Sequence, residues 1–364
     1  MMILIVLLLL TLLGAGLYYA YYSLGVLAPS WPWLRVGVVG GSIMCLLSLV
    51  LSFAGREIFP IWFLRLSYSL GTSWLFVFLY LMMPLLLWGL IYLCLPIARG
   101  LLTDNCWLTL GLLLSVASVL LHGYYEYRDK KRVALEIDIS KPLPKPLKIV
   151  GISDLHLGYT IGRGELSQWV DKINAEQADL ILIAGDILDN DARPVLQEGM
   201  HEELNRLKAR LGVFACLGNH EYIGREAQRR DVLSRTNIKL LQDETILVDS
   251  TFYIIGRDDR MNPYRRSTQE LVQGLDHSKP ILLLDHQPYN LEHSEAAGID
   301  FQLSGHTHRG QVFPINLLVD ALYEQSHGYL RKGNTHFYVS SGIGLWGGKF
   351  RIGTQSEYVC VTLR

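Results

Sequence analysis

Apolar residues fill the first third of the chain, and apolar and polar residues alternate in the remainder, so the pattern divides the sequence into two parts. From Met1 to Leu34 there is no charged side chain. A helix that crosses a membrane needs about 20 apolar residues. Four runs reach that length, roughly 2–22, 36–55, 68–97 and 106–123. They predict four membrane-spanning helices, the third of which is long enough to tilt or to bend at Pro84.

The flanking charges predict an orientation for these helices. A cleaved signal peptide is an alternative for the first run, but no Lys or Arg precedes it and no clear small-x-small site ends it. With four crossings, the N-terminus and the C-terminal part share one side. The basic residues on that side outnumber those opposite, Arg56, Arg65, Arg128, Lys130, Lys131 and Arg132 against Arg35 and Arg99. We therefore expect a multi-pass protein of the cell membrane with a cytoplasmic C-terminal domain, although three or five crossings would reverse this.

The segment "YYEYRDKKR", residues 124–132, is typical of the exit from a bilayer, because tyrosines precede mixed charges. It is either a solvated juxtamembrane face or a lipid site. The segment "SKPLPKPLK" follows with three prolines, which indicate a semi-rigid spacer. The expected organisation is a membrane anchor over 1–127, a juxtamembrane Pro-rich linker over 128–147 and a C-terminal domain over 148–364.

From Lys148 onward short apolar runs alternate with amphipathic segments. The segment 164–177 places Leu166, Trp169, Val170 and Ile173 on one helical face, and 194–210 also resembles a helix. The expected strands are "KIVGISD", "ADLILIAGD", "GVFACLGNH", "TFYIIGRDD", "PILLLDHQ", "DFQLSGHTH", "HFYVSSG" and "EYVCVTL". This alternation predicts an α/β fold in which some later strands are antiparallel.

Composition supports the division into two parts and excludes some functions. Half of the residues are hydrophobic and 18% are charged, which fits neither an ordinary soluble enzyme nor a protein that lies wholly in the membrane. A formal net charge of -1 gives no indication of nucleic-acid binding. The five cysteines show no CxxC spacing, so we expect buried packing residues and no disulfide framework.

Polar residues follow the predicted strands at five of their ends. They are Asp154, Asp186, Asn219, His286 and the pair His306 and His308. Because the carboxyl ends of strands converge on one crevice in an open α/β sheet, these side chains are expected to share a site. Carboxylates, an amide and imidazoles together suit Mn, Fe or Zn, whereas calcium requires oxygen ligands.

These motifs resemble those of the calcineurin-like metallophosphoesterases, whose pattern is DxH, GD, GNH[DE], H and GHxH in that order. Here the pattern is met without a substitution, by Asp154 to His156, Gly185 to Asp186, Gly218 to Glu221, His286 and Gly305 to His308. The extended "GHTHRGQ" and the C-terminal "YVSSGIGLWGGKFRIGTQSEYVCVTL" are similar to the membrane-associated branch. The resemblance covers about 146–364 and implies a four-layer αββα sandwich.

The resemblance also implies two divalent metal ions and a set of ligands. One ion would be held by Asp154, His156, Asp186 and His308, and the other by Asn219, His286 and His306, with Asp186 as the bridge. Such a pair activates water and clamps phosphoryl oxygens during an in-line displacement.

Other residues are expected around the ligands. His220 resembles the family's catalytic histidine that faces the leaving oxygen, and Asp189 is either its orienting partner or a turn residue. Arg257, Arg309 and Arg351 are candidate substrate-binding residues, because guanidinium groups match phosphate oxygens. Charge clusters such as "GRDDRMNPYRRS" are also common on solvated surfaces.

The expected function is hydrolysis of a phosphodiester or pyrophosphate bond by a membrane-anchored, metal-dependent phosphoesterase. Its location favours a lipid-linked phosphorylated substrate, and similarity to the membrane-associated branch suggests one such as UDP-diacylglucosamine. The alternatives are a protein phosphatase, a cyclic-nucleotide or nucleotide phosphodiesterase, and a non-catalytic membrane adaptor. The segment 315–325 is either core packing or an apolar lip through which a lipid enters.

Overall fold

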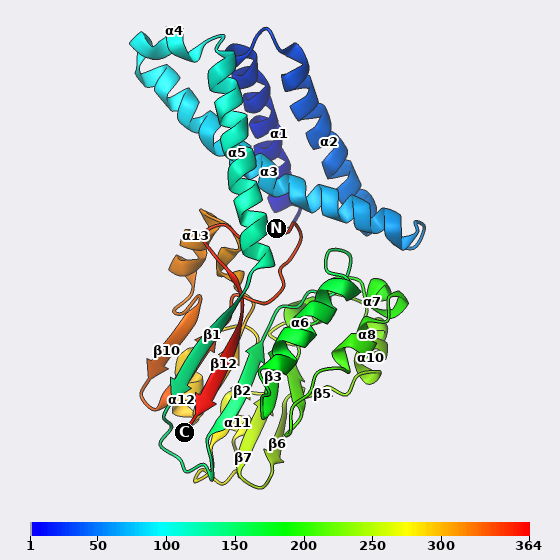
Figure 1. Cartoon of the computed structure of the whole chain (residues 1–364), viewed down its shortest axis with the longest axis vertical. Coiled ribbons are helices and arrows are strands. Elements are labelled where there is room, and N and C mark those ends of the chain that lie inside the picture. The colour runs from blue at the N-terminus through cyan, green and yellow to red at the C-terminus, as the bar shows by residue number, and fades with distance from the viewer. Residues whose placement is uncertain (1) are drawn as a thin grey trace. The chain divides into compact units, whose positions relative to one another are not determined.

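The computed structural model describes residues 2–364, with side chains for all of these except 2–7 and 9. Its contacts divide the chain into two compact units, Met1–Gly123 and Tyr124–Arg364 (Figure 1). The boundary lies inside a helix, so the second unit begins with the last turn of that helix.

The first unit is helical, as the apolar runs predict. Its elements are α1 (Met2–Leu27), α2 (Pro32–Ala54), α3 (Ile61–Cys94), the short η1 (Pro96–Ala98) and α4 (Arg99–Leu102), and most of α5 (Cys106–Arg128). Four of these helices are long and apolar enough to cross a membrane, with spans at Leu10–Leu27, Pro32–Ala54, Ile61–Cys94 and Cys106–Arg128. Helix α3 continues through Pro84.

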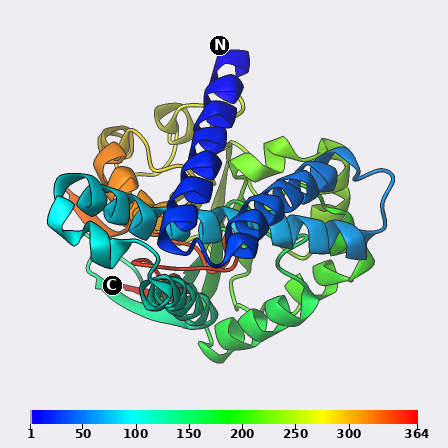
Figure 2. The same cartoon turned by 90° about the horizontal axis from the view of Figure 1, so that it is seen from above.

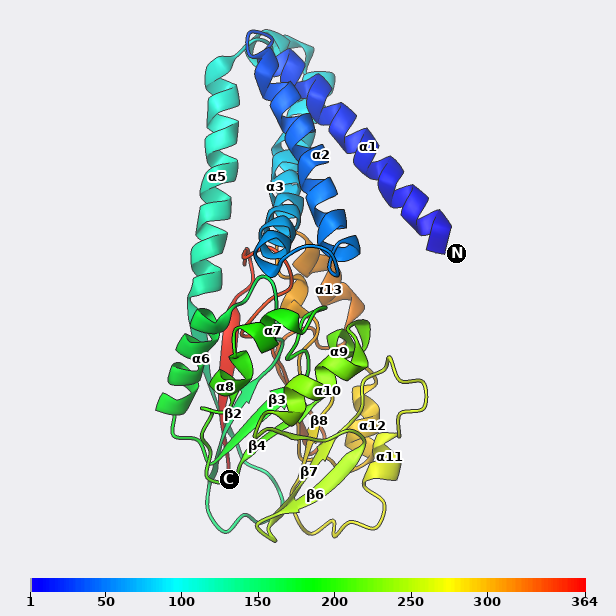
Figure 3. The same cartoon turned by 90° about the vertical axis from the view of Figure 1, so that its right-hand side faces the viewer.

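Helices α2 and α3 lie along each other in Figures 2 and 3. Gly71 of α3 permits this close approach, because a Cβ there would lie 2.6 Å from Cβ of Leu49 on α2. Small residues at such contacts let helix backbones pack tightly where burial from water provides no driving force.

The second unit contains two six-stranded sheets. The first has the order β1 (Lys130–Ile137), β12 (Ser356–Leu363), β2 (Leu147–Ile152), β3 (Leu180–Ala184), β4 (Val213–Cys216) and β5 (Lys239–Leu240). The second has the order β10 (Gly328–Lys332), β11 (Thr335–Val339), β9 (Phe301–Ser304), β8 (Ile281–Leu284), β7 (Phe252–Gly256) and β6 (Glu244–Val248). Strands β2 to β5 run parallel, as do β7, β8, β9 and β11, whereas β6, β10 and β12 pair antiparallel with β7, β11 and β2.

Three apolar layers hold the sheets and helices together. Leu182 of β3, Leu284 of β8 and Leu303 of β9 are buried between the two sheets. The outer face of the first sheet is covered by α6 (Arg163–Ala175), α7 (Arg193–Gln197), α8 (Met200–Leu204) and α10 (Glu226–Ser234). Helices α11 (Thr268–Leu271) and α12 (Leu291–Ala296) cover the second sheet (Figure 3). The expected four-layer αββα sandwich is confirmed.

The structure corrects the predicted linker. Residues 130–137 form strand β1, which pairs in parallel with β12 over its whole length, from Lys130 opposite Ser356 to Ile137 opposite Leu363. The alternation of Val133, Leu135 and Ile137 places apolar side chains on the inner face of the sheet. The spacer is therefore shorter than predicted, and the catalytic domain begins within one residue of the end of α5.

The predicted helix over 194–210 is also corrected. It is two short helices, α7 and α8, separated at Gly199, whose φ of 65° is left-handed and interrupts the helix.

Candidate metal centre

Five strands bring the predicted polar residues to one place. The segments directly after β2, β3 and β4 carry Asp154, Asp186 and Asn219, while those after β8 and β9 of the other sheet carry His286 and His306. The amide of His306 donates to Oδ1 of Asp154 over 3.0 Å. His286 Nδ1 donates to the carbonyl of Ala184 at the end of β3 over 2.7 Å. The loops that follow strands of both sheets therefore meet at the carboxyl ends of those strands, as predicted.

Asp154, His156 and His308 form the first cluster of potential ligands, all three with a donor atom within 4.8 Å of the others. The two Nε2 atoms of His156 and His308 face each other at 3.0 Å. Asp154 Oδ1 lies 3.9 Å from His156 Nε2 and 3.6 Å from His308 Nε2. Three electron-pair donors thus point toward one small volume, as the ligands of a single ion do.

Asp186, His286, His306 and Asn219 form the second cluster. His286 Nε2 lies 3.2 Å from Asp186 Oδ2 and 3.2 Å from Asn219 Oδ1. The same amide oxygen of Asn219 is 2.8 Å from His306 Nδ1. His306 and His308, although only two residues apart, therefore belong to different clusters.

Asp186 lies between the two clusters. Its Oδ2 atom is 3.2 Å from His286 Nε2 in the second cluster and 3.6 Å from His156 Nε2 in the first. Two adjacent cations repel each other unless an anion lies between them, and a carboxylate in this position could supply that anion.

The protonation of the site fits divalent cations. Burial lowers the pKa of His156 to about 4 and that of His306 to about 3, and it holds the pKa of His308 well below its usual value. These imidazoles are neutral near pH 7 and keep a lone pair for a metal. Burial also raises the pKa of Asp154 to about 6. A buried carboxylate among neutral imidazoles is stabilised by a bound cation. Burial would lower the pKa of His286, but the charge of Asp186 outweighs it and raises that pKa well above its usual value, so a cation held by His286 would displace a proton. With that exchange, the residues present fit a pair of cations.

The backbone of the site adopts a conformation that is rare outside glycine. Asp154, His156, Asp186, His306 and His308 all have φ between 46° and 72°. Such residues cluster at functional sites, because the surrounding structure must hold them against a cost of about 1–3 kcal/mol each. The strain indicates that these loops are shaped for the site.

Two motif glycines are required by how closely the loops approach. A Cβ at Gly218 would lie 2.2 Å from Asp186 Oδ1, and one at Gly305 would lie 2.4 Å from Asp154 Oδ2. Neither position has room for any other side chain beside its carboxylate. The glycines of "GNH" and "GHTH" therefore allow two pairs of loops to touch, the loop of Gly218 with that of Asp186 and the loop of Gly305 with that of Asp154.

His220 and Asp189 form a pair beside the first cluster. His220 Nδ1 lies 3.1 Å from Asp189 Oδ1, and the ring of His220 packs edge-on against that of His156, 4.5 Å between centroids. Burial would lower the pKa of His220, but the hydrogen bond to Asp189 and the charge of Asp186 outweigh it and raise the pKa to about 9. The pair holds a proton on an imidazole that borders the clusters.

Glu221 is a residue whose position the sequence analysis missed. Its carboxylate is 2% exposed and accepts three backbone N–H groups, from Gly218 at 2.7 Å, Leu188 at 2.8 Å and Asp186 at 3.0 Å. It therefore ties the loop after β3 to the loop after β4. The acidic fourth position of "GNHE" was the available signal, because a Glu or Gln at the third residue of a helix is typical of a capping box.

The three predicted substrate-binding arginines have different surroundings. Arg309 remains accessible, with a side chain 39% exposed, and it forms an ion pair of 3.2 Å with Asp320. Arg257 is nearly buried, and its donors are taken by Asp285 Oδ2 and the carbonyl of Arg266, each at 3.0 Å. Arg257 thus holds its own loop to Asp285, which is itself buried.

Arg351 is fully buried, so it cannot contact a substrate in this conformation. Its guanidinium donates to the carbonyls of His308 at 2.9 Å, Ser341 at 2.5 Å and Gly344 at 2.8 Å. These bonds brace the loop that carries His308. The expected substrate contact of Arg351 is therefore replaced by a structural one.

Known proteins show similarity over this same part of the chain. A family model described as calcineurin-like phosphoesterase matches residues 147–310. An uncharacterised metallophosphoesterase of Helicobacter pylori strain J99 is 31% identical over 262 residues, which cover 70% of each chain. A Campylobacter jejuni metallophosphoesterase is 34% identical over 236 residues, 63% of this chain and 62% of its own. A transmembrane protein with metallophosphoesterase domain from Bos taurus is 31% identical over 242 residues, 61% and 54% of the two chains.

Fold, site and similarity define the class: the chain belongs to the calcineurin-like metallophosphoesterases. It is a metal-dependent phosphoester hydrolase that also carries apolar helices of membrane-spanning length.

Proposed function

We propose that the protein is a membrane-anchored phosphoesterase with two metal ions, which hydrolyses a phosphodiester or pyrophosphate bond in a lipid-linked substrate. The observation that carries the catalytic part is the position of Asp186 Oδ2 between His156 of one cluster and His286 of the other. The other six predicted ligands belong to the two clusters that flank this carboxylate, with Asp154, His156 and His308 in the first and Asn219, His286 and His306 in the second. Mn, Fe or Zn would suit this set of oxygen and nitrogen donors.

Each group of residues has a defined task in this scheme. Two divalent cations, when bound, would supply Lewis acidity to the phosphoryl oxygens and activate the attacking water. Asp189 accepts the Nδ1 proton of His220 and so fixes the tautomer of the ring. His220 then presents Nε2–H, from which the leaving oxygen takes its proton.

Arg309 is the predicted substrate contact whose side chain is accessible. Its pair with Asp320 is partly exposed, and such pairs are worth only about 0–1 kcal/mol, so a phosphate group can compete for the guanidinium. Arg309 directly follows the ligand His308, which places it beside the clusters.

An exposed apolar helix supports an amphipathic substrate. Helix α13 (Ile315–Leu322) follows the short η2 (His308–Gly310), and the Arg309–Asp320 pair joins the two. Leu317, Leu318 and Leu322 are 57%, 59% and 66% exposed. Neighbouring apolar side chains that remain in water indicate contact with a lipid or another apolar group. This favours the lipid-entry interpretation of 315–325 over core packing.

The membrane part of the proposal is supported by the four candidate spans and by the Bos taurus relative, whose name describes a transmembrane protein. The excess of basic residues on one side favours a cytoplasmic catalytic domain. A multi-pass anchor in the cell membrane would keep the site near lipid-linked phosphates such as UDP-diacylglucosamine.

The test uses the full chain in detergent micelles with Mn²⁺, supplied in parallel with UDP-diacylglucosamine and with soluble bis(p-nitrophenyl) phosphate. We expect metal-dependent cleavage of both, with the higher kcat/KM on the lipid. Leu318→Ser should raise KM for the lipid only. Leu247 is an exposed leucine on β6, and Leu247→Ser should leave KM unchanged for both substrates.

Three outcomes would contradict the proposal. Equal KM values for the Leu318→Ser and unchanged chains on the lipid would remove the role of α13. A higher kcat/KM on a phosphopeptide or a cyclic nucleotide would favour a protein phosphatase or a nucleotide phosphodiesterase. Absence of metal-dependent cleavage of every substrate would favour a non-catalytic adaptor.

A further inference from the structure

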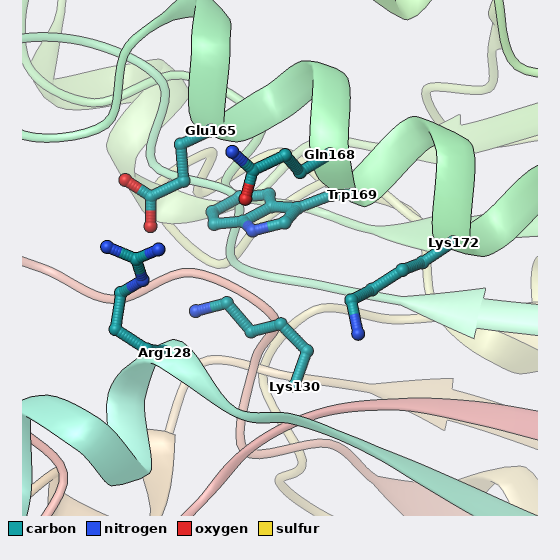
Figure 4. Close-up of a pocket in the computed structure, with 6 residues that line it drawn as sticks. All are labelled: Arg128, Lys130, Glu165, Gln168, Trp169 and Lys172. Atoms are coloured by element: carbon teal, nitrogen blue, oxygen red, sulfur yellow. The ribbon is translucent and has the colours of Figure 1, made fainter.

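A polar cavity lies in the catalytic unit outside the metal centre. It has a volume of about 110 Å³ and is lined by Arg128, Lys130, Glu165, Gln168, Trp169 and Lys172, the cationic pocket (Figure 4). None of these residues is a predicted metal ligand or contacts one in the described part of the chain. The pocket therefore has no role in the proposed hydrolysis.

Two segments that are distant in sequence build the cationic pocket. Helix α6 contributes Glu165, Gln168, Trp169 and Lys172, whose spacing of three and four residues puts them on one face. Arg128 is the last residue of α5, and Lys130 is the first of β1. Figure 4 shows the side chains of both segments pointing into the space between them.

Positive charge dominates the pocket and is not neutralised by carboxylates. Its one acid, Glu165, accepts a hydrogen bond from the hydroxyl of Tyr127 and forms an ion pair of 2.6 Å with Lys349. Among the side chains that the structure describes, no carboxylate oxygen lies within 4.0 Å of the charged nitrogens of Arg128, Lys130 or Lys172. Three cations thus share a pocket whose acid is already paired.

Lys130 is the most constrained of these cations, with only 5% of its surface exposed. Its Nζ donates to the carbonyl of Tyr127 at 2.6 Å and lies 3.5 Å and 4.8 Å from the ring centroids of Tyr127 and Trp169. Burial lowers the pKa of Lys130 well below its usual value. A buried lysine with one hydrogen bond has donors left for an anion, and a bound anion would favour the charged form that burial disfavours.

The chemistry of the pocket matches a phosphate group. Arg128 offers a planar fork of donors, and Lys172 and Lys130 offer ammonium groups around the same space. Trp169 is itself buried and forms one wall of this space. The volume admits a phosphate head, whereas an acyl chain would have to remain outside.

The position of Arg128 identifies the source of the phosphate. Arg128 ends the candidate membrane span Cys106–Arg128, and Tyr124 and Tyr125 lie one turn before it. Basic residues directly after a membrane span attract anionic lipids, at about 1 kcal/mol for each Lys or Arg. We propose that the cationic pocket binds the phosphate of an anionic phospholipid head group. Of the two interpretations of "YYEYRDKKR", the structure thus favours the lipid site over the solvated face.

Binding is tested on the full chain in lipid-free nonionic detergent by native mass spectrometry. The chain is titrated separately with phosphatidylglycerol, with phosphatidylcholine and with phosphatidylglycerol in the presence of inorganic phosphate. We expect one retained phosphatidylglycerol and little phosphatidylcholine. The double variant Arg128→Gln/Lys172→Gln should weaken retention at least about tenfold, since it removes charge-assisted hydrogen bonds.

Lys208→Gln is the matched control, because Lys208 is also exposed but lies outside the pocket. It should retain phosphatidylglycerol as the unchanged chain does. Thermal unfolding provides a second readout, in which phosphatidylglycerol should raise the midpoint of the unchanged chain and phosphatidylcholine should not.

Equal retention of the two lipids, or unaltered retention by the double variant, would overturn the proposal. Displacement of phosphatidylglycerol by an equimolar amount of inorganic phosphate would show that free phosphate is the ligand. Metal-dependent hydrolysis of bis(p-nitrophenyl) phosphate is measured on the same samples, so that failure of the pocket and failure of the proposed function are distinguished.

Discussion

Replacing Glu221 by glutamine tests whether this carboxylate holds the metal centre together. Both of its oxygens accept from the backbone, Oε2 from Gly218 and Asp186 and Oε1 from Leu188. A glutamine side chain has one acceptor oxygen and one NH₂ group. If the oxygen serves Gly218 and Asp186, the NH₂ group faces the N–H of Leu188, and two donors meet.

The size of the effect follows from that mismatch. One buried N–H without an acceptor costs about 1–3 kcal/mol. For a domain of roughly 150–250 residues, each kcal/mol lowers the unfolding midpoint by about 2–4 °C. We therefore expect Glu221→Gln to lower the midpoint of the catalytic unit by about 2–12 °C. Because the loops that it joins carry Asp186 and Asn219, the variant should also bind metal more weakly.

The assay is scanning fluorimetry of the full chain in micelles, with and without Mn²⁺. Glu244→Gln is the control, since Glu244 is an exposed glutamate on β6. The control should unfold at the temperature of the unchanged chain. A midpoint for Glu221→Gln that equals that of Glu244→Gln, with the same stabilisation by Mn²⁺, would refute the reasoning.

Further predictions concern residues around the site and one surface network. His220→Asn should keep metal while kcat falls by about 10²–10⁴-fold, the usual contribution of a general acid, and a kcat near that of the unchanged chain would contradict its role. Arg351→Met should lower the unfolding midpoint, because it leaves buried carbonyls without a donor. Arg309→Gln should raise KM at an unchanged midpoint. The opposite result for the two variants would mean that Arg351 binds substrate and Arg309 braces the fold. The bidentate hydrogen bond from Arg132 lowers the pKa of Glu176 from 4.5 to about 2. The stabilisation of the fold by this ion pair should be complete above about pH 4.5 and be lost as the pH falls through about 2. In an acid titration of unfolding, Glu176→Gln should not show the loss of stability that the unchanged chain shows over this range.

The clustering of the candidate ligands could be predicted because their positions depend on local pattern. A carboxylate, an amide or an imidazole follows five of the apolar strands, and parallel strands bring their carboxyl ends together. The position of a polar residue after a strand was therefore enough to predict which side chains lie close together in space. The separation of His306 and His308 into different clusters followed the family's arrangement and agrees with their contacts.

Strand β1 could not be predicted because its partner is far away in sequence. Lys130, Lys131 and Arg132 make its first half strongly charged, which is typical of a juxtamembrane segment. The strand forms because β12, more than 200 residues later, offers a parallel edge along 130–137. Non-local pairing of this kind leaves little trace in the sequence of one strand.

The role of an arginine could not be predicted from its place in a motif. Arg309 and Arg351 both lie in segments that resemble the membrane-associated branch, but only Arg309 is accessible. The burial of Arg351 depends on carbonyl groups that three separate loop positions supply. Charge and motif position together predicted phosphate binding for both arginines, whereas their tertiary contacts distinguish an accessible side chain from one that braces a loop.

The most direct test of the two-metal account is the metal content and activity of Asp186→Asn. Full chains loaded with Mn²⁺ are measured by mass spectrometry of the metal and by hydrolysis of bis(p-nitrophenyl) phosphate, with Asp138→Asn, an exposed aspartate after β1, as the control. The account predicts two ions and full activity for the unchanged and control chains, and at most one ion and no turnover for Asp186→Asn. Two retained ions with undiminished turnover in Asp186→Asn would contradict it.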